Sequence, residues 1–133
     1  IKYNMKKLLI ILSLFITSHI VISQEDITPK ITECISTSNV KGLCVYFSDN
    51  IDMEIDDEWE IYTRSQSEIV LKDFFSKNTP TNFLIIQKGE SKMGVFFKIG
   101  ILKTKQGRSY RIIFNIKSVN DNFKISQIQI NEN

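Results

Sequence analysis

The sequence contains no alanine and only one histidine, His19, which lies in an N-terminal segment with the pattern of an export signal. If that segment is removed, the folded part has no imidazole, which excludes catalytic triads, histidine–metal sites and histidine general bases. The two cysteines cannot form a zinc site without histidine. The sequence also has no Gly-rich phosphate loop, nucleophile elbow or dinucleotide fingerprint. We therefore expect no cofactor and no bound metal.

The charge balance gives no reason to expect a nucleic-acid partner. The 133 residues carry 17 Lys+Arg and 15 Asp+Glu, a formal net charge of +2. Removal of Lys2, Lys6 and Lys7 with the leader leaves 14 basic groups against 15 acidic ones, a net charge of −1. Nucleic-acid binding needs a basic surface that releases counterions from phosphates. At 42% hydrophobic and 24% charged residues, the composition fits one small globular domain and excludes collagen, a coiled coil and a disordered chain.

Residues 1–23 are predicted to be a signal peptide, with residues 1–4 as extra residues before the initiator methionine. Two lysines precede an apolar run from Leu8 to Ile22, and the small residue Ser23 and then the polar Gln24-Glu25-Asp26 follow. This run of 15 residues has four polar interruptions, whereas a membrane-spanning helix needs roughly 20 apolar residues. We expect cleavage after Ser23, export to the periplasm or the outside of the cell, and no stable membrane span afterwards. An uncleaved N-terminal anchor is the alternative.

Export changes how the two cysteines, Cys34 and Cys44, are interpreted. An oxidising compartment would allow them to form a disulfide. Each also falls on an apolar helical face, where a cysteine behaves as a small buried hydrophobe. We favour two buried thiols, because the sequence does not show the Cα separation that a disulfide requires.

Three helices are predicted from capping residues and helical spacing. Thr28 is expected to cap the first, with Pro29 at the first helical position, where its missing N–H costs nothing. Asn39 is expected to cap the second, whose apolar stripe comprises Val40, Leu43, Cys44 and Phe47. A capping box over Ser65–Glu68 is expected to begin the third. Its apolar residues are Ile69, Leu71, Phe74 and Phe75.

Six strands are predicted around these helices. Residues 51–55 alternate between apolar and acidic, which indicates one buried face and one solvated acidic face. A second short strand holds Trp59, Ile61 and Tyr62. Four more are expected over 83–87, 94–104, 109–117 and 123–131, and their short connections indicate an antiparallel meander. In the last strand the apolar parity shifts between Ile125 and Ile128, which predicts a β-bulge near Ser126–Gln127.

This order of elements describes a single α+β domain over residues 24–133: a cone-shaped, strongly curved antiparallel sheet packed on three helices. Acidic residues gather between positions 49 and 60 and basic residues between 88 and 124, so we expect an electrically dipolar molecule.

Segments spread along the chain resemble a family of short exported bacterial proteins, mostly from Bacteroidetes, known as domain of unknown function 4783. They are Asn39–Leu43, Tyr46–Asn50, Ser67–Phe75, Lys88-Gly89, Ile99-Gly100 and Tyr110-Arg111. The resemblance covers residues 26–131 and implies the cone fold of the nuclear-transport-factor-two-like and cystatin-like proteins. It implies a secreted or periplasmic domain without established activity, cofactor or catalytic residues, so no functional residue is carried over.

Enzymes of that superfamily use the open mouth of the cone as a pocket, and three residues are candidates for ligand binding there: Trp59, Tyr62 and Arg111. Arg111 has the opposite parity to Tyr110 and points either into the mouth or to solvent. If it points inward, its guanidinium can bind a carboxylate bidentately. Trp59 and Tyr62 would be amphipathic contacts, or else pack the third helix on the sheet.

We expect a non-enzymatic exported domain that binds a small ligand, peptide or protein partner through the mouth or the exposed sheet face. Two alternatives stay open. One is an isomerase or lyase without histidine, in which a buried carboxylate acts with Tyr62 or Arg111 as electrophilic helper. The other is a structural homodimer formed sheet to sheet.

Overall fold

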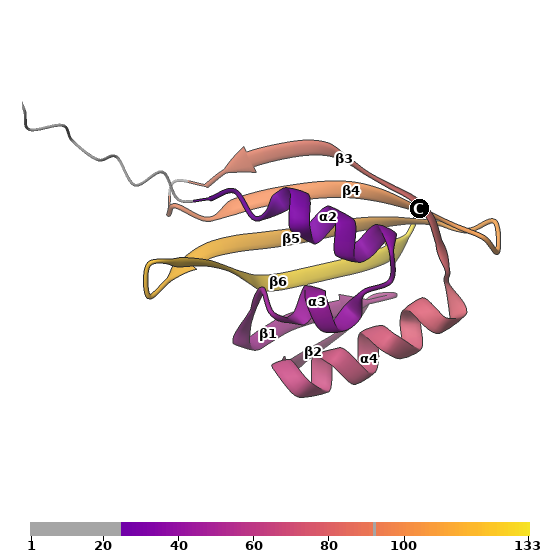
Figure 1. The fold of residues 1–133 in the computed structure, drawn as a ribbon, viewed down its shortest axis with the longest axis horizontal. Coiled ribbons are helices and arrows are strands. Elements are labelled where there is room, and N and C mark those ends of the chain that lie inside the picture. The colour runs from indigo at the N-terminus through magenta and orange to yellow at the C-terminus, as the bar shows by residue number, and fades with distance from the viewer. Residues whose placement is uncertain (1–24, 92) are drawn as a thin grey trace, which may run out of the picture.

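The computed structural model describes residues 25–91 and 93–133, so the predicted signal peptide and His19 lie outside the described residues. Three helices lie on one side of a curved six-stranded sheet (Figure 1). The helices are α2 (Thr28–Ser36), α3 (Val40–Cys44) and α4 (Arg64–Lys77). The strands are β1 (Phe47–Ile55), β2 (Glu58–Thr63), β3 (Pro80–Glu90), β4 (Phe96–Thr104), β5 (Ser109–Val119) and β6 (Asn122–Glu132). The predicted α+β cone fold is confirmed.

The strand order is β2-β1-β6-β5-β4-β3. Strands β3 to β6 form the predicted antiparallel meander. The expectation of a wholly antiparallel sheet is wrong at one place, because β1 runs parallel to β6, with Met53 opposite Ile128. A parallel pair needs a long crossover rather than a tight turn, and here α4 and the meander supply it. The β1–β2 hairpin thus extends the sheet beyond β6.

The core lies between the helices and the concave face of the sheet. In β5, Tyr110, Ile112, Phe114 and Ile116 point into it, as their alternation predicts. They pack with buried residues of the helices, among them Ile31, Leu43 and Leu71. Each fully buried aliphatic or aromatic side chain contributes about 1.5–3 kcal/mol. Helices as short as α2 and α3 are marginal in isolation, so this packing stabilises them.

The structure corrects two features of the predicted first and second helices. The N-cap of α2 is Ile27 rather than Thr28, and the Thr28 N–H and hydroxyl both donate to Asp26 Oδ1, at 3.0 and 2.6 Å. Asn39 caps α3 as predicted, since its Oδ1 accepts from the Gly42 N–H at 2.9 Å. That helix ends at Cys44, and Phe47, the last residue of the predicted stripe, begins β1.

The capping box of α4 lies two residues before the predicted one. Thr63 is the N-cap and Gln66 the third helical residue, and each side chain accepts a hydrogen bond from the backbone N–H of the other. Thr63 leaves β2 with an extended backbone, which is the conformation that an N-cap requires. Ile69, predicted to face the core, is 71% exposed, while the other three apolar residues of the prediction are buried.

The predicted bulge in β6 is confirmed. Asn115 lies opposite Gln127 and Ile116 opposite Ile125, so Ser126 is an extra residue that has no residue opposite it in β5. Such a residue bends its strand and increases the local twist. It also keeps Ile125 and Ile128 on the buried face although they are an odd number of residues apart.

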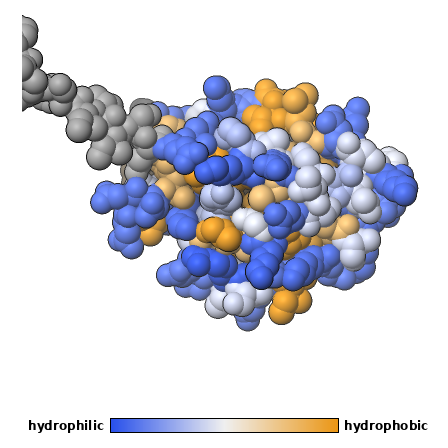
Figure 2. All heavy atoms as spheres, in the orientation of Figure 1, coloured by the Kyte–Doolittle hydropathy of each residue, from blue (hydrophilic) through white to orange (hydrophobic). Residues whose placement is uncertain are grey.

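The helix-bearing side of the molecule is largely polar, with an apolar patch along the β3 edge (Figure 2). No helix within the described ranges is long and apolar enough to cross a membrane.

Candidate functional site

A cavity of about 420 Å³ opens at the mouth of the cone, between α4 and the sheet. The β1–β2 turn and the start of β5 border it. Its floor consists of buried or half-buried apolar and aromatic side chains: Met53, Ile55, Tyr62, Val70, Phe74 and Tyr110. Ligand sites are typically concavities that combine apolar and aromatic side chains with a few convergent polar groups.

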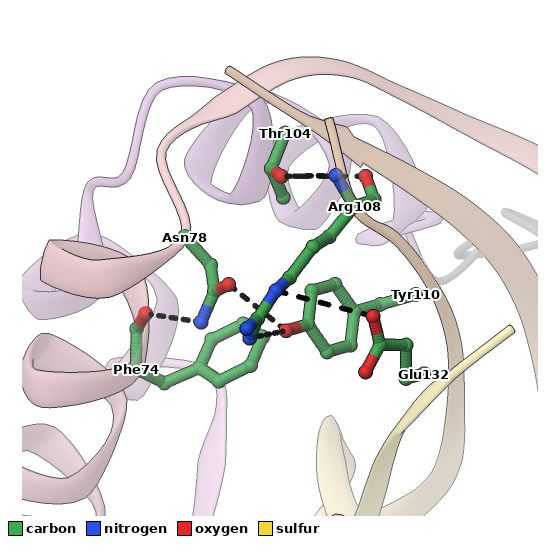
Figure 3. Close-up of polar contacts among 6 residues, drawn as sticks. All are labelled: Phe74, Asn78, Thr104, Arg108, Tyr110 and Glu132. Carbon is green, nitrogen blue, oxygen red and sulfur yellow. Dashed lines mark hydrogen bonds and ion pairs between the residues drawn. The ribbon is translucent and has the colours of Figure 1, made fainter. Parts of the chain in front are cut away.

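A hydrogen-bond network holds Tyr110 in the floor (Figure 3). The Tyr110 hydroxyl donates to Asn78 Oδ1 at 2.9 Å, and Asn78 Nδ2 donates to the Phe74 carbonyl at 3.0 Å. The Phe74 and Tyr110 rings meet edge to face, with centroids 5.0 Å apart. Asn78 and Tyr110 are both buried, so these bonds satisfy polar atoms that would otherwise be costly to bury. The network therefore fixes the end of α4 against β5.

Arg108 extends this network to the rim of the mouth. Its Nη1 donates to the Tyr110 hydroxyl at 3.2 Å, and its Nε lies 3.9 Å from Glu132 Oε1. The Tyr110 hydroxyl, and after it Glu132, raises the pKa of the Arg108 guanidinium. Thr104 holds the start of β5, since its Oγ1 accepts from the Arg108 N–H at 3.1 Å. Arg108 is thus anchored through its backbone while its guanidinium stays exposed.

The rim of the mouth carries charges of both signs. Asp56 comes from the β1–β2 turn, Glu58 from the start of β2, and Asp73 and Lys77 from α4. All of these rim residues are exposed. Asp73 and Lys77 form an ion pair of 2.8 Å one helical turn apart. The mouth is therefore a pocket with an apolar floor and a charged rim, which has an acidic wall around the β1–β2 turn and a basic group, Arg108, just before β5.

The structure separates the three residues predicted to bind a ligand. Tyr62 lines the mouth, because it lies opposite the buried Ile51 and shares its face. Trp59 alternates to the face of the sheet opposite the helices, here called the far face, where it is 50% exposed. Arg111 lies between the buried Tyr110 and Ile112 in β5, so it too points to the far face and is exposed. Of the two directions left open for Arg111, the structure shows the outward one.

One carboxylate among the described residues is buried, and it lies outside the mouth. Glu54 alternates with Met53 and Ile55 and belongs to the far face, but it is only 7% exposed. Asn131 Nδ2 donates to Glu54 Oε1 at 2.7 Å, and the Asp57 N–H donates to Asn131 Oδ1 at 3.1 Å. The prediction of a uniformly solvated acidic face is therefore wrong at Glu54, which ties the hairpin turn to β6.

Both cysteines are free thiols. Cys44 is buried, and desolvation raises the pKa of its thiol to about 11. Cys34 is half-buried against the core, and desolvation, followed by Glu33, raises the pKa of its thiol as well. A raised pKa keeps a thiol protonated and unreactive near neutral pH.

A smaller cavity of about 200 Å³ lies at the opposite end of the cone, where α2 begins. The rings of Phe96 and Phe123 meet edge to face there, with centroids 5.7 Å apart. Lys98 and Asp26 are its charged lining residues. This cavity has about half the volume of the mouth, and its described lining residues form no hydrogen-bond network like that of Tyr110, so the mouth is the better candidate site.

Sequence reasoning missed Asn78 and Arg108 as site residues. Asn78 is the C-cap of α4, and Arg108 follows a turn, both positions where polar residues are ordinary. Tyr110 was predicted only as a core residue. The available signal was its hydroxyl, because a buried tyrosine normally needs a hydrogen-bond partner.

Comparison with known proteins identifies the fold and the family. The family model of Domain of unknown function (DUF4783) matches residues 28–131. A search of curated proteins found no match.

Solved structures of DUF4783 proteins are similar to this chain. A protein from Bacteroides fragilis YCH46 is 27% identical, with 81% of this chain and 100% of that chain covered and a TM-score of 0.75. One from Bacteroides uniformis ATCC 8492 is 22% identical, with 81% and 98% covered and the same TM-score. An NTF2-like protein of unknown function from Shewanella baltica OS155 is 9% identical, with 100% and 98% covered and a TM-score of 0.62. The last two similarities concern the fold alone.

Proposed function

The chain belongs to the DUF4783 family of domains of unknown function, and from this premise we propose that it is a binding domain whose mouth, between α4 and the sheet, takes a small ligand or the end of a peptide. The observation that carries the proposal is the cavity of about 420 Å³ with an apolar floor and the Tyr110–Asn78–Arg108 network. Its volume falls in the range of roughly 300–1,000 Å³ that is usual for ligand pockets.

Binding is better supported than proton transfer. A carboxylate that acts as general base near neutral pH needs a desolvated position close to the substrate. Asp56, Glu58 and Asp73, the carboxylates of the mouth, are all solvent-exposed. The buried Glu54 lies on the far face, away from Tyr62. The isomerase or lyase alternative therefore has no carboxylate in the required place among the described residues.

We also propose that the domain works outside the cytoplasm, on the basis of the leader pattern in residues 1–23. The mass of the mature protein purified from cell fractions tests this. Cleavage after Ser23 with the protein in the periplasm or medium supports export. A full-length protein in the cytoplasm contradicts it.

A thermal-shift screen with cell-envelope metabolites and short peptides, paired with pull-down from an envelope extract, tests the binding function. Hits should bind the wild type and the Arg111→Gln variant equally and should lose affinity in Tyr62→Ala, since Tyr62 lines the mouth and Arg111 points to the far face. Circular dichroism must show that both variants fold. No specific hit, or hits that Tyr62→Ala leaves unchanged, would refute the proposal.

Self-association through the far face of the sheet is a second candidate function. This face carries exposed apolar side chains on both edge strands of the sheet, with Ile61 of β2 65% and Leu84 of β3 60% exposed. Large apolar side chains left exposed on a sheet face are surface that a second copy of the chain can bury. Light scattering at high concentration should then show a dimer that Leu84→Lys weakens. A wild-type monomer would remove this candidate.

A further inference from the structure

We propose that the mouth selects compact zwitterions: Arg108 receives a carboxylate, the β1–β2 turn receives an ammonium group, and the floor receives an apolar side chain. A dipeptide with hydrophobic side chains has all three groups. This inference rests on the proposed function of the mouth and names the chemical class of its ligand.

The opposite charges of the mouth stand apart. Asp56 and Glu58 lie on one wall and Arg108 on another, and no ion pair within 4.0 Å joins them in the part of the chain that the structure describes. Asp56 nevertheless contributes, as the weakest of several causes, to the raised pKa of Arg108. The walls thus interact across the cavity without closing it, and a ligand charged at both ends can bridge them.

The acidic wall has free binding capacity. Within the described ranges, the carboxylates of Asp56 and Glu58 accept no hydrogen bond and form no ion pair. Asp73 differs, because Lys77 neutralises it at 2.8 Å. Asp56 sits in the two-residue turn with a positive φ of 51°, and the Asp56 N–H donates to the Ile130 carbonyl at 3.0 Å. The turn is therefore held against β6 while the carboxylates of Asp56 and Glu58 remain available for an ammonium group.

Arg108 is suited to the other end of the ligand. Its Nη1 donates to Tyr110, and the contact of its Nε with Glu132 is long, at 3.9 Å. Its Nη2 makes no hydrogen bond with the described residues. A planar guanidinium binds a carboxylate through two parallel hydrogen bonds. Polyanions such as nucleotides are disfavoured, because the two carboxylates of the opposite wall would repel them.

Four forms of one probe test the inference: leucylphenylalanine, its N-acetyl form, its C-terminal amide and the doubly blocked form. Titrations followed by amide chemical shifts should show the free dipeptide binding about five- to tenfold more tightly than either singly blocked form. Arg108→Gln should remove the difference between acid and amide. The double variant Asp56→Asn, Glu58→Gln should remove the difference between amine and N-acetyl.

Matched controls use the far face of the sheet. Arg111→Gln repeats the Arg108→Gln change, and Asp52→Asn repeats the Asp56→Asn change, at exposed residues outside the mouth, and both should preserve the two preferences. Equal binding of all four peptides, or preferences that survive in the mouth variants, would overturn the inference. If the doubly blocked peptide binds the mouth as well as the free one, zwitterion selection fails and the proposed binding function stands. If no peptide binds, the inference fails, and the envelope screen separately decides the binding function.

Discussion

The Tyr110 hydroxyl donates a hydrogen bond of 2.9 Å to Asn78 Oδ1, which joins strand β5 to the C-cap residue of α4. This bond lies below the mouth and is shielded from water, because both residues are buried. It connects the stability of the fold with the shape of the candidate site.

Tyr110→Phe should lower the free energy of unfolding by about 1–2 kcal/mol, because it leaves Asn78 Oδ1 buried without a donor. Urea denaturation followed by fluorescence measures the change. Tyr46→Phe is the control, since the Tyr46 hydroxyl makes no hydrogen bond with the described residues and its loss should cost under about 0.5 kcal/mol. Equal effects of the two substitutions would contradict a role for the Tyr110–Asn78 bond.

Thr63→Ala should cost about 1 kcal/mol of stability, the usual effect of removing an N-cap side chain. Ser65→Ala should cost much less, although Ser65 begins the capping box that the sequence suggests. In the structure it is Thr63 whose side chain accepts the Gln66 N–H, at 3.3 Å. Urea denaturation of both variants decides between the capping box at Thr63 and the one at Ser65. A larger loss of unfolding free energy in Ser65→Ala would contradict the structure.

Sequence reasoning succeeds where a structural feature depends on residues of a single helix or strand. Parity along a single strand predicted both the buried face of β5 and the bulge at Ser126, because alternation is a local property. The cap at Asn39 is equally local. The box of α4 was misplaced because Thr63 and Ser65 both fit the pattern, and the extended end of β2 decides between them.

The remainder depends on contacts between distant parts of the chain. The parallel pairing of β1 with β6 joins residues about 75 positions apart, as Met53 and Ile128 are, without a connecting turn that would set its direction. The mouth likewise joins Asn78 to Tyr110 across 32 residues. The strand pattern could not tell whether Arg111 faces the mouth, because that depends on which side of the sheet all the helices occupy.

Cys44 should react very slowly with a thiol reagent in the native protein. Its pKa of about 11 leaves about 100-fold less thiolate at pH 8 than an ordinary thiol has. In a Cys34→Ser variant, in which Cys44 is the remaining thiol, the rate of Cys44 labelling should rise about tenfold per pH unit up to about pH 11 while the protein remains folded. Because the unfolded thiol ionises first, this group lowers stability as pH rises from about 9 to 11. Rapid labelling at pH 8 would contradict the burial of Cys44.

Gly100→Ala should destabilise the domain by about 1–3 kcal/mol, the usual cost of overpacking. A Cβ at this position would overlap the ring of Phe83, which is only 5% exposed and cannot easily move. Gly89→Ala is the matched control, because its Cβ would meet the ring of Phe97, which is half-exposed and can rotate away. The midpoint temperature of thermal unfolding should be lower for Gly100→Ala than for Gly89→Ala, and the reverse order would contradict this packing.

The most direct test of the account is the location of ligand binding on the folded protein. Amide chemical shifts should be recorded during titration with the tightest ligand from the envelope screen. We predict that the perturbed residues cluster at the mouth, around Tyr62, Asn78 and Arg108. Perturbations confined to the far face, around Trp59 and Arg111, would contradict the claim that the mouth is the binding site.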